Sequence, residues 1–269
     1  MTVEGEELEG GWQSSVIRRG DVVHRSGGSW SSSVLAFLRH LEEVGFAGSP
    51  RVVGSGFDDK GNETLTFVDG ASPHPHAWSA DGVWQLGSML ADLHRAAESF
   101  SPPPDAVWQD WFGRPLGDIS RSFGHGDLGQ WNVIARDGMP VGFIDWDTAG
   151  PCDPVWEVAQ TAWLNAQLFH DELADELELG SARERAQRLA AFIDGYGLGR
   201  DDRAGLVDKM VEFAVRAAEH EAVEHRIRPD TTAGVADDGY PFAWGMAWRI
   251  RSAAWMLENR SLLERGLCN

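Results

Sequence analysis

Three oxygen-bearing side chains stand at short spacings near the middle of this 269-residue chain: Asp127, Asn132 and Asp145. Between them lie two apolar stretches, 133–135 and 141–144, joined by a polar turn. Such a pattern predicts a β-hairpin. Asp127 and Asn132 precede its first strand and Asp145 ends its second. Pairing of the strands would therefore bring the three side chains together.

This set of groups suits phosphoryl transfer. A hard cation such as Mg²⁺ prefers oxygen ligands, which two of these side chains could supply. A separate carboxylate could then accept the proton of an attacking hydroxyl. Turn chemistry alone would also use Asp, Asn and Gly, but it predicts no particular spacing across two motifs. A metal-dependent hydrolase with His125 and Asp127 as ligands is a weaker alternative, because no second histidine-rich motif lies near them.

Two motifs carry a resemblance to a known family. The run His-Gly-Asp-Leu-Gly-Gln-Trp-Asn at 125–132 matches the protein-kinase pattern His-Arg-Asp-Leu-x-x-x-Asn except that Gly126 replaces arginine, and Ile-Asp-Trp-Asp follows at 144–147. Both motifs resemble those of the aminoglycoside phosphotransferase and choline kinase group. The segment 153–159 is similar to that group's Asp-Pro-x-x-Asp-Leu-Ala, with Glu157 in place of the second Asp.

The resemblance extends, with decreasing strength, over about residues 10–165. It implies an α+β, two-lobed protein-kinase-like fold. Residues 1–70 would form a nucleotide-binding lobe with a small antiparallel sheet and one helix. Residues 71–269 would form a larger, mainly helical lobe that holds the catalytic hairpin and binds the acceptor. The implied activity is that of a kinase, which transfers the γ-phosphate of ATP or GTP to a hydroxyl of a small molecule such as an aminoglycoside-like antibiotic or a metabolite.

The same resemblance assigns roles to individual residues. Asp127 would orient or deprotonate the acceptor hydroxyl, and Asn132 with Asp145 would bind Mg²⁺. His125 would brace the catalytic loop. Asp147 could line the acceptor side, support a neighbouring ligand or cap the next turn.

The nucleotide side departs from the family pattern. Family members place a lysine on an early strand and pair it with a glutamate on the following helix. This chain has only two lysines, Lys60 in a polar turn and Lys209 in the late helical region. Arg25, at the end of a predicted strand, is the nearest stand-in, although its planar fork differs from a lysine point charge. The first two turns of the following helix contain no glutamate.

Other features of the nucleotide side are weaker. Gly10 and Gly11 give a partial phosphate-loop signal that an ordinary hairpin turn explains equally well. Val68, at the end of a predicted strand, is assigned to the same side. These departures leave a second class of function open, a catalytically impaired kinase-like protein that binds a ligand.

Apolar periodicity predicts the elements that would position these residues. A Pro- and His-containing stretch at 69–76 separates the two lobes. Beyond residue 156 the pattern is mainly helical, and Trp244, Trp248 and Trp255 are expected in the core. The predicted strands before the hairpin are 10–18, 21–25, 51–54 and 64–68, and the predicted helices are 33–44 and 80–98.

Composition limits the possible partners. The formal net charge is -19, with 42 acidic and 23 basic residues, which argues against binding to nucleic acid or to an anionic membrane. It slightly favours a cationic acceptor. Two cysteines make no disulfide framework, and no apolar run approaches a membrane span. We therefore expect a soluble cytoplasmic protein. Its oligomeric state is left open.

Overall fold

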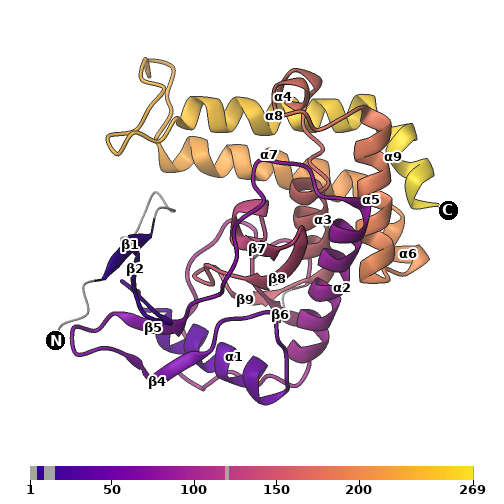
Figure 1. The fold of residues 1–269 in the computed structure, drawn as a ribbon. Coiled ribbons are helices and arrows are strands. Elements are labelled where there is room, and N and C mark those ends of the chain that lie inside the picture. The colour runs from indigo at the N-terminus through magenta and orange to yellow at the C-terminus, as the bar shows by residue number, and fades with distance from the viewer. Residues whose placement is uncertain (1–4, 9–15, 119–120, 269) are drawn as a thin grey trace.

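The N-terminal part of the molecule is a five-stranded antiparallel sheet with one helix. The computed structural model describes residues 5–8, 16–118 and 121–268. The sheet has the strand order β1-β2-β3-β5-β4, and α1 packs beside it (Figure 1). Strands β2 and β3 form an antiparallel hairpin around Gly20, in which Arg19 pairs with Val22. The elements are β1 Glu6–Leu8, β2 Val16–Arg19, β3 Val22–Arg25, α1 Ser31–Glu43, β4 Val52–Phe57 and β5 Glu63–Thr66.

Helix α1 ties this sheet to the rest of the molecule through one apolar face. Its buried residues include Phe37, whose ring lies 4.9 Å from that of Phe100, 6.1 Å from that of Phe123 and 6.0 Å from that of Trp146, centroid to centroid. Trp146 directly follows Asp145. The aromatic cluster around Phe37 therefore connects α1 to the segment that carries the predicted site.

The second part of the molecule holds two short strand pairings within a helical body. Strands β7 and β8 form the predicted hairpin, with Val133 opposite Phe143. Strands β6 and β9 pair beside it, so the predicted catalytic loop leaves β6 and enters β7. The elements are α2 Ala80–Ala97, β6 Ser122–Gly124, the 3-10 turn η1 Gln130–Asn132, β7 Val133–Arg136, β8 Met139–Phe143 and β9 Gly150–Cys152.

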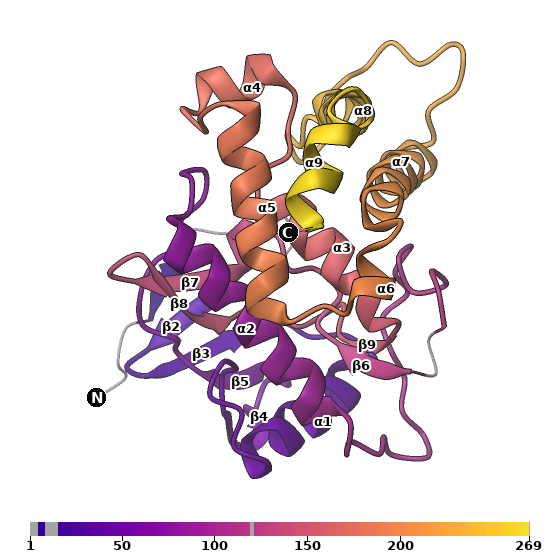
Figure 2. The ribbon, with the colours of Figure 1, turned by 90° about the vertical axis from the view of Figure 1, so that its right-hand side faces the viewer.

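Helices make up most of the remaining chain. In Figures 1 and 2, α2 lies beside α5, and α7 runs alongside α8. Helix α3 contacts both α5 and α7. None of the helices in the described ranges is long and apolar enough to cross a membrane. These helices are α3 Pro154–Asn165, α4 Asp171–Glu176, α5 Ala182–Tyr196, α6 Arg200–Arg203, α7 Leu206–Glu224, α8 Phe242–Glu258 and α9 Arg260–Leu267.

The tryptophans of α8 were expected in the core, and one of them is not. Trp255 is buried, and Trp248 stacks on the buried Trp163 of α3 at a centroid distance of 5.5 Å. Trp244 is 46% exposed. It lies in the first turn of α8, at the outer end of the α7–α8 pair (Figure 1), and its ring meets that of His170, just before α4, edge-on at a centroid distance of 6.2 Å.

Removal of the Phe37 ring tests the aromatic cluster. Phe37→Ala should lower the free energy of unfolding by about 3–5 kcal/mol, because it leaves a cavity beneath α1. Phe57→Ala, on an exposed part of β4, is the matched control and should cost less than about 1 kcal/mol. Urea unfolding of both variants measures the difference. Equal losses would contradict the assignment of Phe37 to the core.

Candidate active site

Asp127 lies in the loop between β6 and β7, and hydrogen bonds fix its carboxylate. Asn132 Nδ2 donates to Asp127 Oδ2 over 3.1 Å and to the Asp127 backbone carbonyl over 2.7 Å. Trp131 Nε1 and Gln160 Nε2 donate to the two carboxylate oxygens, each over 3.4 Å. Burial and the nearby charge of Asp145 raise the pKa of Asp127 to about 6, against the opposing effect of these donors. A carboxylate with a raised pKa is a better proton acceptor than an ordinary one.

His125 connects the catalytic loop to the end of β8. Its Nε2 lies 2.8 Å from the Ile144 backbone oxygen, and its ring lies 4.5 Å from that of Trp146, centroid to centroid. The side chain is fully buried, and burial lowers its pKa. A neutral imidazole can donate a hydrogen bond to this carbonyl and so hold the two segments together. The bond fixes the position of the loop relative to Asp145.

Asp145 lies two residues after the end of β8, near the catalytic loop. Its backbone φ is 61°, in the left-handed region that non-glycine residues seldom adopt. Its side chain is 53% exposed, and Oδ1 accepts a 2.8 Å hydrogen bond from Arg25 Nη1. The structure thus brings Asp127, Asn132 and Asp145 to one side of the hairpin, as the spacing predicts.

Arg25 reaches this group from the sheet and pairs with three carboxylates. Only 7% of the residue is exposed. Besides Asp145, its guanidinium bonds to Glu63 over 2.8 Å and to Asp147. Burial would lower the pKa of Arg25, but the three carboxylates together raise it above its ordinary value. The last residue of β3 therefore places a fixed positive charge beside Asp145.

Glu63 is the partner that the sequence analysis missed. It lies on β5, directly opposite Arg25 in the sheet register, and only 1% of it is exposed. The glutamate that family members place on the helix is thus replaced by one on a neighbouring strand. A single acidic residue at the start of the apolar segment Glu63–Thr66 was the available signal, since an unpaired buried carboxylate would be strongly destabilising.

The remaining predicted residues are Asp147, expected to line the acceptor side, support a neighbouring ligand or cap the next turn, and those assigned to the nucleotide side. Asp147 lies with Arg25 and accepts a 3.1 Å hydrogen bond from Trp30 Nε1. Val68 follows β5 and packs over Gly142 of β8, since a Cβ built there would lie 3.0 Å from Val68 Cγ1. Gly10 and Gly11 lie outside the described residues.

The side-chain oxygens of Asn132 and Asp145 fit the requirements of a hard divalent cation. Asn132 turns its amide nitrogen toward Asp127, so its amide oxygen is free to serve as a ligand. Asp145 presents a half-exposed carboxylate that holds Arg25 through one oxygen. Amide and carboxylate oxygens are the ligands that Mg²⁺ prefers. The site residues therefore agree with the predicted metal.

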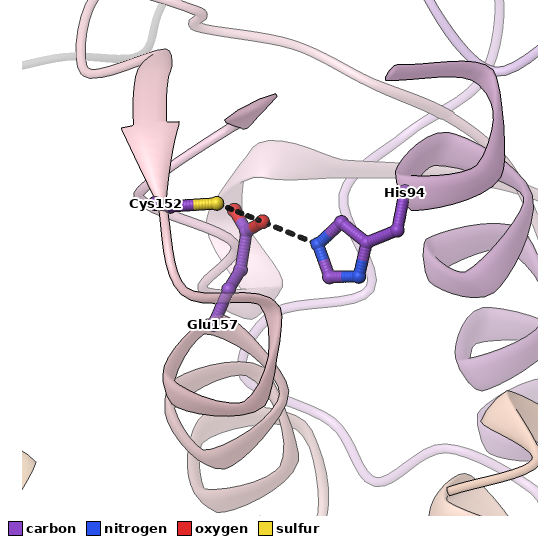
Figure 3. Close-up of side chains that lie close together, drawn as sticks. All are labelled: His94, Cys152 and Glu157. Atoms are coloured by element: carbon purple, nitrogen blue, oxygen red, sulfur yellow. Dashed lines mark hydrogen bonds and ion pairs between the residues drawn. The ribbon is translucent and has the colours of Figure 1, made fainter. Parts of the chain in front are cut away.

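Behind the loop, Glu157 of α3 lies between His94 of α2 and Cys152 of β9 (Figure 3). Its Oε1 accepts a 2.6 Å hydrogen bond from the Gly126 backbone N–H, next to Asp127. Its Oε2 lies 2.7 Å from His94 Nε2 of α2 and 3.8 Å from Cys152 Sγ of β9. His94 Nδ1 in turn lies 2.8 Å from the Tyr196 hydroxyl of α5. We refer to Glu157, His94, Cys152 and Tyr196 as the Glu157 network.

Two observations show how the longer Glu157 side chain is accommodated where the family has Asp. Gly124 leaves the necessary space, because a Cβ there would overlap the Glu157 carboxylate. Burial would raise the pKa of Glu157, yet the bonds to His94 and Gly126 hold it below its ordinary value. The ligand-type atoms of His94, Cys152 and Glu157 lie within 4.8 Å of one another, but hydrogen bonds already join them, and burial keeps Cys152 a thiol by raising its pKa. The network is therefore a support for the catalytic loop.

The charge of Glu157 predicts a pH dependence of stability. A carboxyl whose pKa is lowered on folding contributes stability that is fully present above its unfolded pKa, about 4.5, and is lost as pH falls through the folded value. Glu157→Gln should cost about 1–3 kcal/mol near pH 7, and the gap to the wild type should narrow below about pH 4.5. Urea unfolding between pH 3 and 7 measures it, with the exposed Glu258→Gln as control. A gap independent of pH would exclude a role for the Glu157 charge.

Comparison with known proteins gives two matches in sequence. A sequence model of the phosphotransferase enzyme family matches residues 102–205, the range that contains the catalytic loop and the hairpin. The trifolitoxin immunity protein of Rhizobium leguminosarum bv. trifolii is 49% identical over 260 residues, which cover 97% of either protein.

Several solved structures share the fold. An amicoumacin kinase superposes with a TM-score of 0.68 at 12% identity, over 94% of this chain and 89% of that one. A microcompartment-associated aminopropanol kinase gives 0.63 at 15%, over 97% and 93%. A choline/ethanolamine kinase family protein from Mesorhizobium loti gives 0.59 at 15%, over 99% and 92%.

These likenesses confirm the predicted α+β, two-lobed protein-kinase-like fold. At such low identity they carry the fold alone. The family match and the 49% identical relative go further. The chain belongs to the phosphotransferase enzyme family and is a small-molecule phosphotransferase with an alcohol group as acceptor.

Proposed function

We propose that the protein transfers the γ-phosphate of ATP or GTP to a hydroxyl group of a small molecule with the help of Mg²⁺. The main support is the convergence of Arg25 from the sheet with Asp145 from the end of the hairpin, on the side where Asp127 and Asn132 lie. Phosphoryl transfer depends on positioning and charge neutralisation more than on covalent chemistry. A fixed guanidinium and a set of oxygen ligands supply both.

Each residue of the site then has a distinct role. Asp127 orients the acceptor hydroxyl and accepts its proton, which its raised pKa favours. Arg25 binds phosphate oxygens with the N–H groups of its fork. Asn132 and Asp145 would hold Mg²⁺, which neutralises phosphate charge when bound. His125 and the Glu157 network hold the loop in place.

The two lobes would divide this work. Residues 1–70, with Val68 and the glycines at 10 and 11, would hold the nucleotide, and residues 71–269 would supply the catalytic loop and the acceptor site. Asp147, which follows the hairpin, would act through its contacts with Arg25 of the sheet and with Trp30. The free thiols of Cys152 and Cys268 agree with a reducing compartment such as the cytoplasm.

The name of the 49% identical relative bears on the acceptor. That protein is a trifolitoxin immunity protein. A phosphotransferase can protect a cell by modifying a toxic compound, so we extend the proposal to an acceptor of the antibiotic or toxin class. An aminoglycoside-like compound or a small metabolite is the other candidate.

Asp127→Asn tests the assignment of the base. Turnover should fall by about 10²–10⁴-fold, since general-base catalysis contributes about that much. The variant should keep the Mg²⁺-dependent thermal shift that ATP or GTP gives the wild type. Asp137→Asn in the exposed turn of the hairpin is the matched control and should be fully active. An active Asp127→Asn variant would show that another group accepts the proton.

Arg25 is tested together with Glu63, because the single change confuses stability with function. Arg25→Met leaves Glu63 buried without its partner and should destabilise the fold by about 3–5 kcal/mol. Arg25→Met/Glu63→Met removes the charge pair and should recover most of that loss. Both variants should still lose about 10²-fold or more in turnover, measured by coupled ADP detection.

If the double variant regains full activity, something other than Arg25 holds the phosphates. If the wild type shows no thermal response to any nucleotide with Mg²⁺, the binding-protein alternative replaces the kinase proposal.

A further inference from the structure

A second arginine that acts on the charge of Asp127, Arg249, comes from α8 of the helical part of the molecule. Trp248 of α8 stacks on Trp163 of α3, and one turn earlier on α3 Gln160 donates to Asp127. This packing brings α8 beside the catalytic loop, and Arg249 is the next residue on α8. Burial is the largest influence on the pKa of Asp127, and the Arg249 guanidinium is among the groups that oppose its rise. The arginine is thus close enough to act electrostatically on the base.

Arg249 is held in place without being enclosed. It forms an ion pair through Nη1 with Glu221 of α7, and its side chain remains 22% exposed. Glu221, Tyr240 and Arg249 converge over Gly245: a Cβ there would lie 2.8 Å from the Tyr240 hydroxyl and 2.9 Å from Arg249 Nη1. Since a guanidinium carries five N–H donors in a planar fork, its bonds to Glu221 and Tyr240 still leave donors for a second anion.

Two further groups at Asp127 are poised for a ligand. Gln160 is 2% exposed, and its Oε1 has no hydrogen-bond partner among the described residues although its Nε2 is bound to Asp127. An unpaired buried amide oxygen is costly unless an N–H donor reaches it. Trp131, 37% exposed, presents an indole ring beside the same carboxylate. An acceptor at Asp127 would therefore meet a cation, an acceptor for N–H and an aromatic ring.

We propose that the acceptor of this phosphotransferase is a hydroxylated acid of the amino-acid or peptide type, whose carboxylate binds Arg249 and whose N–H group donates to Gln160 Oε1. This inference rests on the proposed function and narrows its substrate class. A chain with a net charge of -19 would attract cations almost anywhere on its surface, so a fixed guanidinium beside the base is a specific feature. Arginine forks match carboxylates in geometry as well as in charge.

Matched acceptor pairs test the carboxylate. L-threonine is compared with L-threoninamide, and Gly-Gly-Thr with its C-terminal amide, so that a free amino acid and a peptide terminus are distinguished. Binding is measured by thermal shift and calorimetry in the presence of Mg²⁺ and a non-hydrolysable ATP analogue, and transfer by ADP release with ATP. At least one acid should bind about 10-fold or more tightly than its amide, because the amide lacks the charged hydrogen bond between the carboxylate and Arg249.

The variants separate recognition from structural support. Arg249→Gln should weaken binding of the acid by about 10- to 100-fold and leave the amide unchanged. Glu221→Gln should strengthen acid binding or leave it unchanged, because it removes the carboxylate that competes for Arg249. If the pair only braced α7 against α8, neither change would discriminate acid from amide. Arg251→Gln, which removes the same charge from the same helix at the Glu172 pair, is the control.

Each result decides the question. The protein could respond to Mg²⁺ and nucleotide but bind acids and amides equally, or bind neither. Either result would overturn the inference and leave the kinase proposal standing. An acid preference that survives Arg249→Gln would also overturn it. Acid binding that depends on Arg249 in a protein without any nucleotide response would support the carboxylate site and contradict the kinase proposal.

Discussion

The site depends on one buried cation and the carboxylates around it. Arg25 lies inside the molecule with Glu63, Asp145 and Asp147 as partners. A charge removed from water to this extent is tolerated only when its partners stand at hydrogen-bonding distance. Glu63 comes from the sheet, whereas Asp145 and Asp147 follow the hairpin. The requirement to pair this one guanidinium therefore fixes the sheet relative to the hairpin, and with it the geometry of the nucleotide side.

The convergence of three candidate catalytic side chains could be predicted from the chain, because they belong to short local motifs. Asp127, Asn132 and Asp145 flank one hairpin, so spacing alone brings them together. Arg25 could be chosen as the stand-in for the strand lysine, because the chain contains only two lysines and neither lies on an early strand. Glu63 could not be identified in the same way: it meets Arg25 through pairing of β3 with β5, strands that are separated in sequence by α1 and β4.

The helical part was predicted as helical, but the faces of its helices were not predicted reliably. Trp244 lies one turn before Trp248 on the same helix, yet it is 46% exposed and meets the His170 ring by its edge. Periodicity shows which residues share a face of a helix, but it does not show how far along the helix a neighbour extends. The Glu157 network could not be predicted from the sequence for a similar reason. His94, Cys152 and Tyr196 come together only when α2, β9 and α5 pack around α3.

The proposed role of Arg25 in place of the strand lysine also determines which reagents can report on this site. Amine-directed affinity labels and lysine-reactive nucleotide analogues rely on a primary amine near the phosphates. Here the two candidate amines are distant: Lys60 lies in the turn before β5, and Lys209 lies on α7 with its amine 5.4 Å from the Trp156 ring. A guanidinium that remains protonated at every accessible pH does not react as an amine nucleophile. Chemical labelling surveys that detect kinases through their lysines would therefore pass over this protein.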